Sequence, residues 1–377
     1  MERLTATFEA WQVWRAGTRE VIDAVVAPAH RGPSRELAGA LAEWAGPHYW
    51  LDEARSQLML VRPAPGERSE RRWLVPLLLL ALTVGCTLAA GAALAGAWAP
   101  RFGVGVEGTI AAVFAFGFDL ANGGWRQLGA GWAFAIPMLT FLGVHELGHL
   151  RAARRHAIDT TLPYFLPIPP TLSPIGTLGA FLRLRSPVLD RRQLLDVGAA
   201  GPLAGFVVAL VLLGWGYTIS VPSMIAPEIH GAFITFAGRP VDLGDSLLTL
   251  GLRRLFFGNA QAVYLSLPAF AGWVGAFLTG LNLLPLSQLD GGHVLYGMLG
   301  RRQAAVGLVT VAVLLWLGHY WWTWYAWVVM SLLVGGGGWT HPAVLAPTRP
   351  VPPARRWIGW ACIVVFALTF VPVPFRL

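Results

Sequence analysis

Long runs of apolar residues, separated by short polar segments, fill most of this 377-residue chain after position 72. A helix needs about 20 consecutive apolar residues to cross the hydrocarbon core of a bilayer. Runs that approach this length lie at about 73–98, 129–150, 196–216, 262–284, 303–318, 320–335 and 357–371. The pattern predicts an all-α polytopic membrane protein with about seven transmembrane helices.

One further apolar segment is shorter than these runs. Within residues 104–122 the stretch 110–118 is apolar, and Glu107 and Asp119 stand beyond its ends. This length suits a re-entrant or interfacial segment better than a span. If the segment did cross, the number of spans would rise by one and the N-terminus would change sides.

Residues 164–185 form an apolar stretch that cannot be one continuous helix. Proline removes a helical hydrogen bond and clashes with the preceding turn. The prolines in or beside this stretch are Pro163, Pro167, Pro169, Pro170 and Pro174. The part from 176 to 184 alternates loosely and predicts a strand or loop. Such backbone is tolerated at membrane depth only beside protein or a water-filled cavity, so we expect a small re-entrant β/loop element, with a cytoplasmic connecting loop as the alternative.

The first 72 residues are polar and mixed in character. Apolar positions have helical spacing at 9–15 and 35–44, whereas 56–62 has the features of a strand. No catalytic pattern occurs in this region. We therefore expect a small soluble or membrane-surface domain, with a specific regulatory or substrate-binding role as the alternative.

Composition agrees with a membrane protein. The chain is 55% hydrophobic and 13% charged, with a mean hydropathy of +0.56. Ordinary soluble domains have about 25% charged residues. The two cysteines, Cys86 and Cys362, lie in apolar runs, so neither a disulfide framework nor a cysteine-type zinc site is available.

The net charge is +8, and all 28 basic residues that contribute to it are arginines, since the chain has no lysine. The arginines gather in short clusters beside apolar runs, which is a topology signal rather than a nucleic-acid footprint. The main clusters fall within 68–72, 151–155, 191–192, 301–302 and 349–356. Because cytoplasmic loops carry the excess of positive charge, the first cluster predicts a cytoplasmic N-terminus.

The sequence His145-Glu-Leu-Gly-His149 lies inside the apolar run at 129–150. Two histidines four residues apart share one helix face, so both can bind a single zinc ion, and Glu146 can act as a general base on metal-bound water. Ionisable residues at membrane depth are costly and mark functional sites. The cluster at 151–155 places the motif just below the cytoplasmic surface. The alternative is a chance match in which both histidines are satisfied in a core.

A catalytic zinc site needs a third protein ligand and an open position. Asp290 is the best candidate, because it follows a proline-interrupted turn at the end of an apolar run. The alternatives are an ordinary turn or helix-capping aspartate at 290 and a rival ligand at His293. Asn282, two helical turns before Asp290, could hydrogen-bond the scissile carbonyl or serve as a polar packing contact.

Three motifs together resemble the site-2 protease family of intramembrane zinc metalloproteases. They are the His-Glu motif at 145–149, Gly201-Pro-Leu-Ala-Gly205, and Asn282-x-x-Pro285-x-x-x-Leu289-Asp290-Gly291. The resemblance covers about 73–300. The segments 164–169, 176–181 and 288–293 are similar to the branch without a PDZ domain, which includes plant chloroplast relatives and many bacterial proteins. The chain departs from the pattern at Ser287-Gln288, where the family often has a second proline; this changes the turn but leaves Asp290 in place.

The resemblance implies one catalytic Zn²⁺ held by His145, His149 and Asp290, with Glu146 as catalytic base and Asn282 in a polar supporting role. It implies cleavage of single-span membrane-protein substrates in or near their transmembrane segments, as in regulated intramembrane proteolysis. A substrate helix must unwind before its carbonyls are accessible. We expect the unwound segment to be held by strand addition, close to the active site, at Gly176, Thr177, Leu178, Gly179, Ala180 and Phe181.

The expected organisation is an N-terminal cytoplasmic or membrane-proximal region at 1–72, a transmembrane metalloprotease core at 73–300 and C-terminal transmembrane helices at 301–377. We expect an integral protein of the bacterial cytoplasmic membrane, in contact with lipid and without a nucleic-acid partner. The sequence does not indicate an oligomeric state. The alternatives are a membrane zinc-binding or transport protein, disfavoured by the scattered remaining histidines, and an inactive protease-like scaffold.

Overall fold

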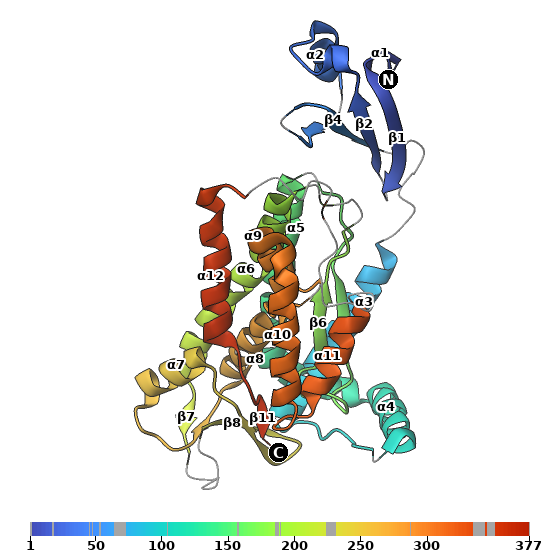
Figure 1. The fold of residues 1–377 in the computed structure, drawn as a ribbon. Helices are drawn as coiled ribbons and strands as arrows, with labels where there is room; N and C mark the ends of the chain where they lie inside the picture. Colours follow the sequence, from blue (N-terminus) through green and yellow to red (C-terminus); the bar gives the residue numbers. More distant parts are fainter. Residues whose placement is uncertain are drawn as a thin grey trace.

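The fold is known from a computed structural model, and Figure 1 shows its ribbon. The structure describes residues 2–16, 19–44, 46, 48–52, 54–63, 73–103, 105–156, 158–184, 188, 190–223, 231–286, 288–334, 344 and 351–376. The expected domain boundary at 72, the arginines Arg68, Arg71, Arg72 and Arg349, and Ser287 lie outside the described residues.

Most of the described chain is helical, and four helical segments are long and apolar enough to cross a membrane. They are Leu74–Leu94, Gly124–Arg155, Arg191–Thr218 and Asp290–Leu317. The first of these segments is α3 and the third is α6. The second segment consists of η2 (Gly124–Gly131) and α5 (Trp132–Arg155). The fourth consists of α9 (Asp290–Leu299), η3 (Gly300–Arg302) and α10 (Gln303–Leu317). The predicted spans at 73–98, 129–150, 196–216 and 303–318 thus correspond to long apolar helical segments.

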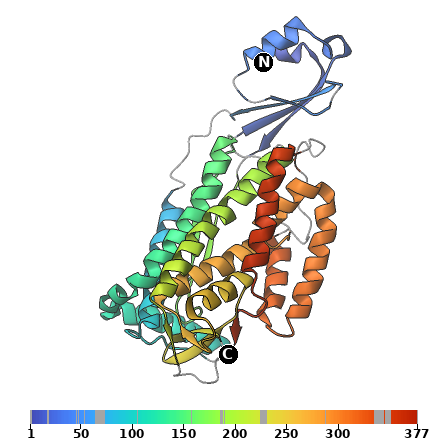
Figure 2. The same ribbon diagram turned by 90° about the vertical axis from the view of Figure 1, so that its left-hand side faces the viewer.

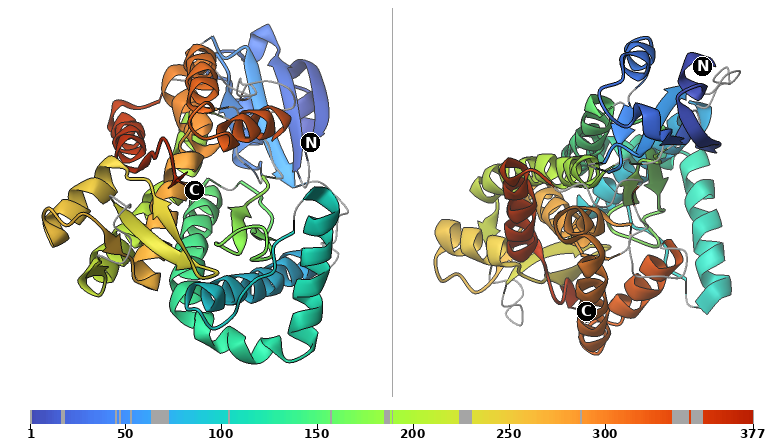
Figure 3. Two further views of the ribbon diagram at one scale, coloured as in Figure 1. Left: turned by 90° about the horizontal axis from the view of Figure 1, so that it is seen from below. Right: turned by 45° about the horizontal axis from the view of Figure 1, so that its top comes forward.

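The other three expected spans form shorter helices. α8 (Leu267–Asn282), α11 (Thr323–Val334) and α12 (Pro353–Thr369) have 16, 12 and 17 residues. At about 1.5 Å per residue, helices of this length cover less than the ~30 Å hydrocarbon core. α4 (Gly105–Ala121) is also short, and it lies at the periphery of the helical bundle (Figure 3).

Close helix packing builds the centre of the bundle, where α6 lies against α5, α8 and α9 (Figure 2). Glycines permit the approach: a Cβ at Gly148 of α5 would lie 2.5 Å from the Ala200 carbonyl oxygen of α6, and one at Gly216 of α6 would lie 2.3 Å from the backbone nitrogen of Ala269 in α8. Small residues at helix contacts are the usual means of packing in membranes. Buried aromatic residues such as Phe134, Phe141 and Trp273 fill the core around these contacts.

The proline-rich stretch after α5 forms an antiparallel hairpin. Its second strand lies within 176–184, where the sequence predicted a strand or loop. β5 (Tyr164–Pro167) pairs with β6 (Thr177–Phe181), and a register shift between Leu166 and Pro167 leaves Leu178 without a partner residue on β5. β5 packs along α3, and β6 contacts both α3 and α5.

The expected all-α fold is incomplete in one respect: the chain also contains sheets outside the bundle. Segment 218–258, which lies between two of the predicted spans, contributes strands to a five-stranded sheet in the order β11-β9-β8-β10-β7. The strands are β7 (Val221–Pro222), β8 (Ala232–Phe236), β9 (Arg239–Leu243), β10 (Val263–Tyr264) and β11 (Phe375–Arg376). The same segment also contains the helix α7 (Leu247–Phe257). This sheet lies at the end of the bundle opposite the N-terminal region (Figure 1).

The N-terminal region forms a small α/β unit with its own apolar core. Its sheet has the order β1-β2-β4-β3, built from β1 (Phe8–Ala16), β2 (Arg19–Val26), β3 (His48–Trp50) and β4 (Gln57–Pro63). α1 (Glu2–Thr5), η1 (Pro28–His30) and α2 (Arg35–Ala42) complete it. The helix expected at 35–44 and the strand expected at 56–62 are confirmed. The helical interpretation of 9–15 is wrong, because this segment pairs with β2 as strand β1.

Candidate metal centre

Two elements far apart in sequence form the centre. His145 and His149 project from one face of α5 and are 3% and 8% exposed. Asp290 is the first residue of α9, and its side chain is 16% exposed. The turn before α9 is tight: a Cβ at Gly291 would lie 2.0 Å from the Leu283 carbonyl oxygen, so glycine at this position lets the chain bring Asp290 inward.

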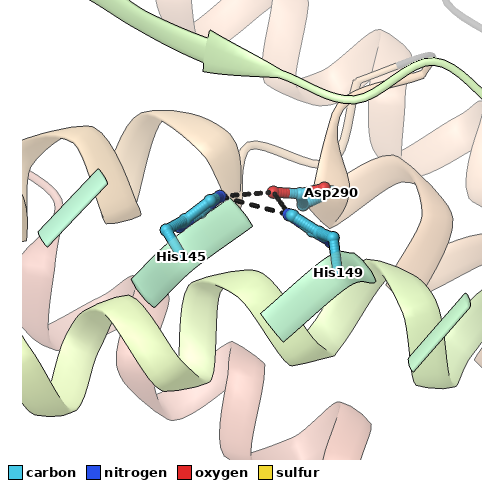
Figure 4. Close-up of side chains that lie close together, drawn as sticks. All are labelled: His145, His149 and Asp290. Atoms are coloured by element: carbon cyan, nitrogen blue, oxygen red, sulfur yellow. Dashed lines mark hydrogen bonds and ion pairs between the residues drawn. The ribbon is translucent and has the colours of Figure 1, made fainter. Parts of the chain in front are cut away.

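The three side chains point toward one another (Figure 4). The Nε2 atoms of His145 and His149 lie 3.2 Å apart, and Asp290 Oδ2 lies 3.5 Å and 3.3 Å from them respectively. Ligand atoms about 2.0–2.2 Å from a tetrahedral zinc ion lie about 3.3–3.6 Å from one another. The donor types and their spacing therefore fit a zinc ion, and the cluster could hold one.

A backbone carbonyl of α6 fixes the orientation of the His149 ring. His149 Nδ1 lies 2.8 Å from the Val197 carbonyl oxygen. A carbonyl only accepts, so Nδ1 donates the proton, and Nε2 of the neutral ring keeps its lone pair on the side facing Asp290 and His145. This partner of the ligand histidine was not expected from the sequence, because every residue carries a carbonyl and no residue type signals its use.

A face of α6 formed by small residues lies directly against the centre. A Cβ at Gly201 would lie 2.0 Å from His149 Nε2, and one at Gly205 would lie 3.0 Å from His145 Nδ1. Gly198 approaches α9 in the same way, since its Cβ would lie 2.6 Å from the Cβ of His293. Any larger residue at 201 would occupy the space that the His149 ring needs.

Glu146 is buried beside these ligand candidates. It is 3% exposed, and its Oε2 has no hydrogen-bond partner among the described residues. A buried carboxylate oxygen without a partner is costly, by about 1–3 kcal/mol or more. Such an oxygen is available to accept a proton from a bound molecule.

Asn282 ends α8 and also reaches the cluster, where its Nδ2 lies 3.4 Å from His145 Nε2. His293, the rival third ligand, lies one helical turn beyond Asp290 and is not part of the cluster found among the described residues. The structure thus brings together His145, His149, Asp290 and Asn282, with Glu146 adjacent to the first of these.

The segment expected to bind substrate lies on β6 and its leading turn. Gly176, at φ +77°, packs so closely on α3 that a Cβ would lie 2.5 Å from the Cys86 carbonyl oxygen. Thr177 Oγ1 donates to the Leu166 carbonyl at 2.9 Å and receives the Gly179 amide proton at 3.0 Å. Leu178 and Phe181 are 60% and 48% exposed, so their apolar side chains are free to contact another molecule or lipid.

Comparison with known proteins finds a family whose members resemble the region that contains this site. Peptidase family M50 matches residues 133–318. Among the relatives is the "Probable zinc metalloprotease EGY2, chloroplastic" of Oryza sativa subsp. indica, 34% identical over 190 residues that make up 48% of this chain and 32% of the relative. The "Probable zinc metalloprotease EGY1, chloroplastic" of Arabidopsis thaliana is 31% identical over 182 residues, 48% of this chain and 32% of the relative.

A bacterial relative is the "Putative zinc metalloprotease Rip2" of Mycolicibacterium smegmatis, 29% identical over 166 residues, which are 43% of this chain and 53% of the relative. The chain spans about a third of the length of the plant relatives it matches. No solved structure matches it. The matched region contains His145, His149 and Asp290, the cluster that could hold a metal ion. Residues 133–318 of this chain therefore form a domain of Peptidase family M50, the zinc metalloprotease family of the site-2 proteases.

Proposed function

We propose that this protein is an intramembrane zinc metalloprotease that hydrolyses peptide bonds in or near the transmembrane segments of other membrane proteins. The observation that carries the proposal is the near-tetrahedral spacing of His145 Nε2, His149 Nε2 and Asp290 Oδ2, at 3.2–3.5 Å, within a bundle of apolar helices. The family match and the names of the relatives support the same activity.

His145, His149 and Asp290 are the proposed zinc ligands. Bound there, zinc supplies the Lewis-acid chemistry that makes water a nucleophile at neutral pH. Val197 holds His149 in the tautomer whose Nε2 faces the ion, and the glycine face of α6 leaves room for both imidazole rings.

Glu146 is the proposed general base. Its partnerless Oε2 takes a proton from the water as the water attacks the peptide carbonyl, and the same proton is then passed to the nitrogen of the departing amine. Asn282, at the edge of the cluster, is placed to donate its amide proton to the carbonyl oxygen of the substrate. Loss of Glu146 should therefore affect the chemical step, whereas loss of Asn282 should affect how the substrate is held.

The β5–β6 hairpin is the proposed binding element for the substrate. A transmembrane helix satisfies its backbone hydrogen bonds internally, so the cleaved segment must first unwind. An unwound segment can pair with an exposed strand, and 176–181 offers both strand backbone and the exposed side chains of Leu178 and Phe181. The proposed substrate is a single-span membrane protein whose cleavage site is brought to α5.

The proposed topology places the metal centre near the cytoplasmic face. α5 ends at Arg155, α6 begins at Arg191, and η3 ends at Arg302. These termini lie at the end of the bundle that faces the N-terminal unit (Figure 2). We propose that α8, α11 and α12 complete seven spans in a bacterial cytoplasmic membrane. In this arrangement 1–72 is a cytoplasmic unit, 73–300 the protease core with its re-entrant hairpin, and 301–377 the C-terminal helices.

The test compares Glu146→Gln with the wild type after reconstitution in liposomes with a single-span substrate. Glutamine keeps the size of glutamate but cannot accept the proton, so the variant should bind one zinc ion and fail to cleave. Glu107→Gln makes the same change at the exposed start of α4 and should retain cleavage. If Glu146→Gln cleaves the substrate at the wild-type rate, the proposed mechanism is refuted; if neither protein cleaves while both bind zinc, a zinc-binding or scaffold role replaces it.

A further inference from the structure

A buried carboxylate links three helices at the arginine-rich end of the bundle. Asp196, in the second turn of α6, is 9% exposed. Its Oδ2 lies 2.9 Å from Nε2 of His156, which caps the C-terminal end of α5. Its Oδ1 accepts a hydrogen bond of 3.1 Å from Nη1 of Arg355 in α12. A buried carboxylate is stable only when it is paired, so these two partners hold the Asp196 side chain in place.

The position of Asp196 connects this link to the metal centre. The next residue in α6 is Val197, whose carbonyl oxygen accepts the Nδ1 proton of His149 at 2.8 Å. The Asp196 side chain and the Val197 carbonyl belong to adjacent residues of one helical turn, so a shift of that turn moves both. Partners of this kind set the tautomer and ring direction of a ligand histidine, and their loss typically weakens metal binding by 10- to 100-fold.

Arg355 comes from α12, which lies outside the residues 133–318 matched by the family. α12 also packs closely on α9, the helix that begins with Asp290. A Cβ at Gly359 of α12 would lie 2.1 Å from the sulfur of Met298 in α9. Its buried residues Cys362 and Val365 share an apolar cluster with Leu195 of α6 and Val294 of α9. The same helix therefore supports the turn that orients His149 and the helix that begins with Asp290.

We propose that Asp196 is a positioning residue for the metal centre, and that α12 acts through Arg355 as part of the scaffold of that centre. The inference rests on the proposed function, because it takes His149 as a zinc ligand. Asp196 itself touches neither the ion nor the substrate. It holds the first turns of α6 in register with the end of α5, and so keeps the Val197 carbonyl within hydrogen-bond distance of the ring.

The experiment measures zinc affinity and cleavage for Asp196→Asn and Arg355→Gln in the purified full-length protein. Zinc affinity is measured by competition with a fluorescent chelator. The matched control is Asp245→Asn, which removes another part-buried carboxylate from a pair with arginine, Arg253, at 2.7 Å, at the opposite end of the bundle. All three variants should lower the unfolding temperature of the zinc-free protein, since each loses an ion pair.

Only Asp196→Asn and Arg355→Gln should weaken zinc binding, by about tenfold, the lower end of the range for partners of ligand histidines. Both should lower kcat while leaving KM unchanged, because neither side chain is placed to meet the substrate. Arg355→Lys, which keeps the charge, should recover part of the affinity.

The inference is overturned if Asp196→Asn and Arg355→Gln bind zinc as tightly as Asp245→Asn does, or if their defect lies in KM alone. Failure of the proposed function gives a different result: the wild type itself would bind no zinc, or Glu146→Gln would cleave normally. The two ideas can therefore fail separately.

Discussion

Replacing Gly201 by alanine tests the metal centre with a single methyl group. The added Cβ would lie 2.0 Å from Nε2 of His149, 2.4 Å from Cδ2 and 2.6 Å from Cε1. Non-bonded heavy atoms prefer separations of about 3.5–4.0 Å, so the ring must retreat by about 1.5 Å. Nδ1 of the same ring is held to α6 by the 2.8 Å hydrogen bond to the Val197 carbonyl oxygen, and a retreat of the ring from α6 would break that bond.

The size of this shift decides the outcome. Metal–ligand distances in working sites vary by only about 0.2 Å, so a retreat of about 1.5 Å removes His149 from the ligand set. Loss of a ligand should weaken zinc binding by more than the 10- to 100-fold caused by loss of an outer partner. We expect Gly201→Ala to bind zinc at least about 100-fold more weakly and to show no measurable cleavage.

Gly214→Ala is the matched control, since it places the same methyl group on α6 at a position where no described residue outside its own stretch of helix lies within 4 Å. Alanine has a higher helix propensity than glycine by about 1 kcal/mol, so this variant should be slightly stabilised and fully active. Zinc content by atomic emission, zinc affinity by chelator competition and cleavage in liposomes provide the comparison. Wild-type zinc affinity in Gly201→Ala would refute the packing of α6 against His149 described above.

Three further outcomes follow from the same structure. Removing zinc with a chelator should lower the unfolding temperature and restoring it should reverse the change, because a ligand at 100 times its Kd stabilises a protein by about 2.7 kcal/mol; an unchanged melting curve would contradict a zinc site. Arg191→Gln should destabilise the protein by about 1.5–3 kcal/mol without changing zinc stoichiometry, because Arg191 donates hydrogen bonds to the carbonyls of Gly297 and Met298 at 3.0 and 2.7 Å. The control Arg192→Gln changes an exposed arginine and should have little effect on the melting temperature. Leu178→Ser and Phe181→Ser should each raise KM by about tenfold and leave zinc affinity intact, because a buried Leu or Phe contributes about 1.5–3 kcal/mol; a fall in kcat alone would argue against the hairpin as the binding element.

The cluster of His145, His149 and Asp290 could be predicted from the sequence because these side chains are unusual for their apolar surroundings. Two histidines and a glutamate within an apolar run have few structural uses, and Asp290 stands at the end of another such run. The helices themselves are set by hydrophobicity and length, which are local properties. These features need no knowledge of what the chain contacts in three dimensions.

Other features depend on contacts that no local pattern contains. Segment 9–15 has apolar residues at helical spacing, yet pairing with β2 makes it a strand. The Val197 carbonyl carries no signal in its residue type, and the role of Gly201 appears only when α6 is seen against His149. The ion pair of Asp196 with Arg355 joins residues 159 positions apart, which periodicity does not reveal.

The long sequence separation within the centre also sets an order of events during biosynthesis. His145 and His149 enter the membrane well before Asp290 has been translated, and Arg355 follows later still. A nascent chain that has inserted α5 therefore carries both histidines of the proposed zinc site but no complete donor set. Under the proposed function, the order of translation alone delays zinc-dependent cleavage until Asp290 has been made, so a partly translated chain has no protease activity.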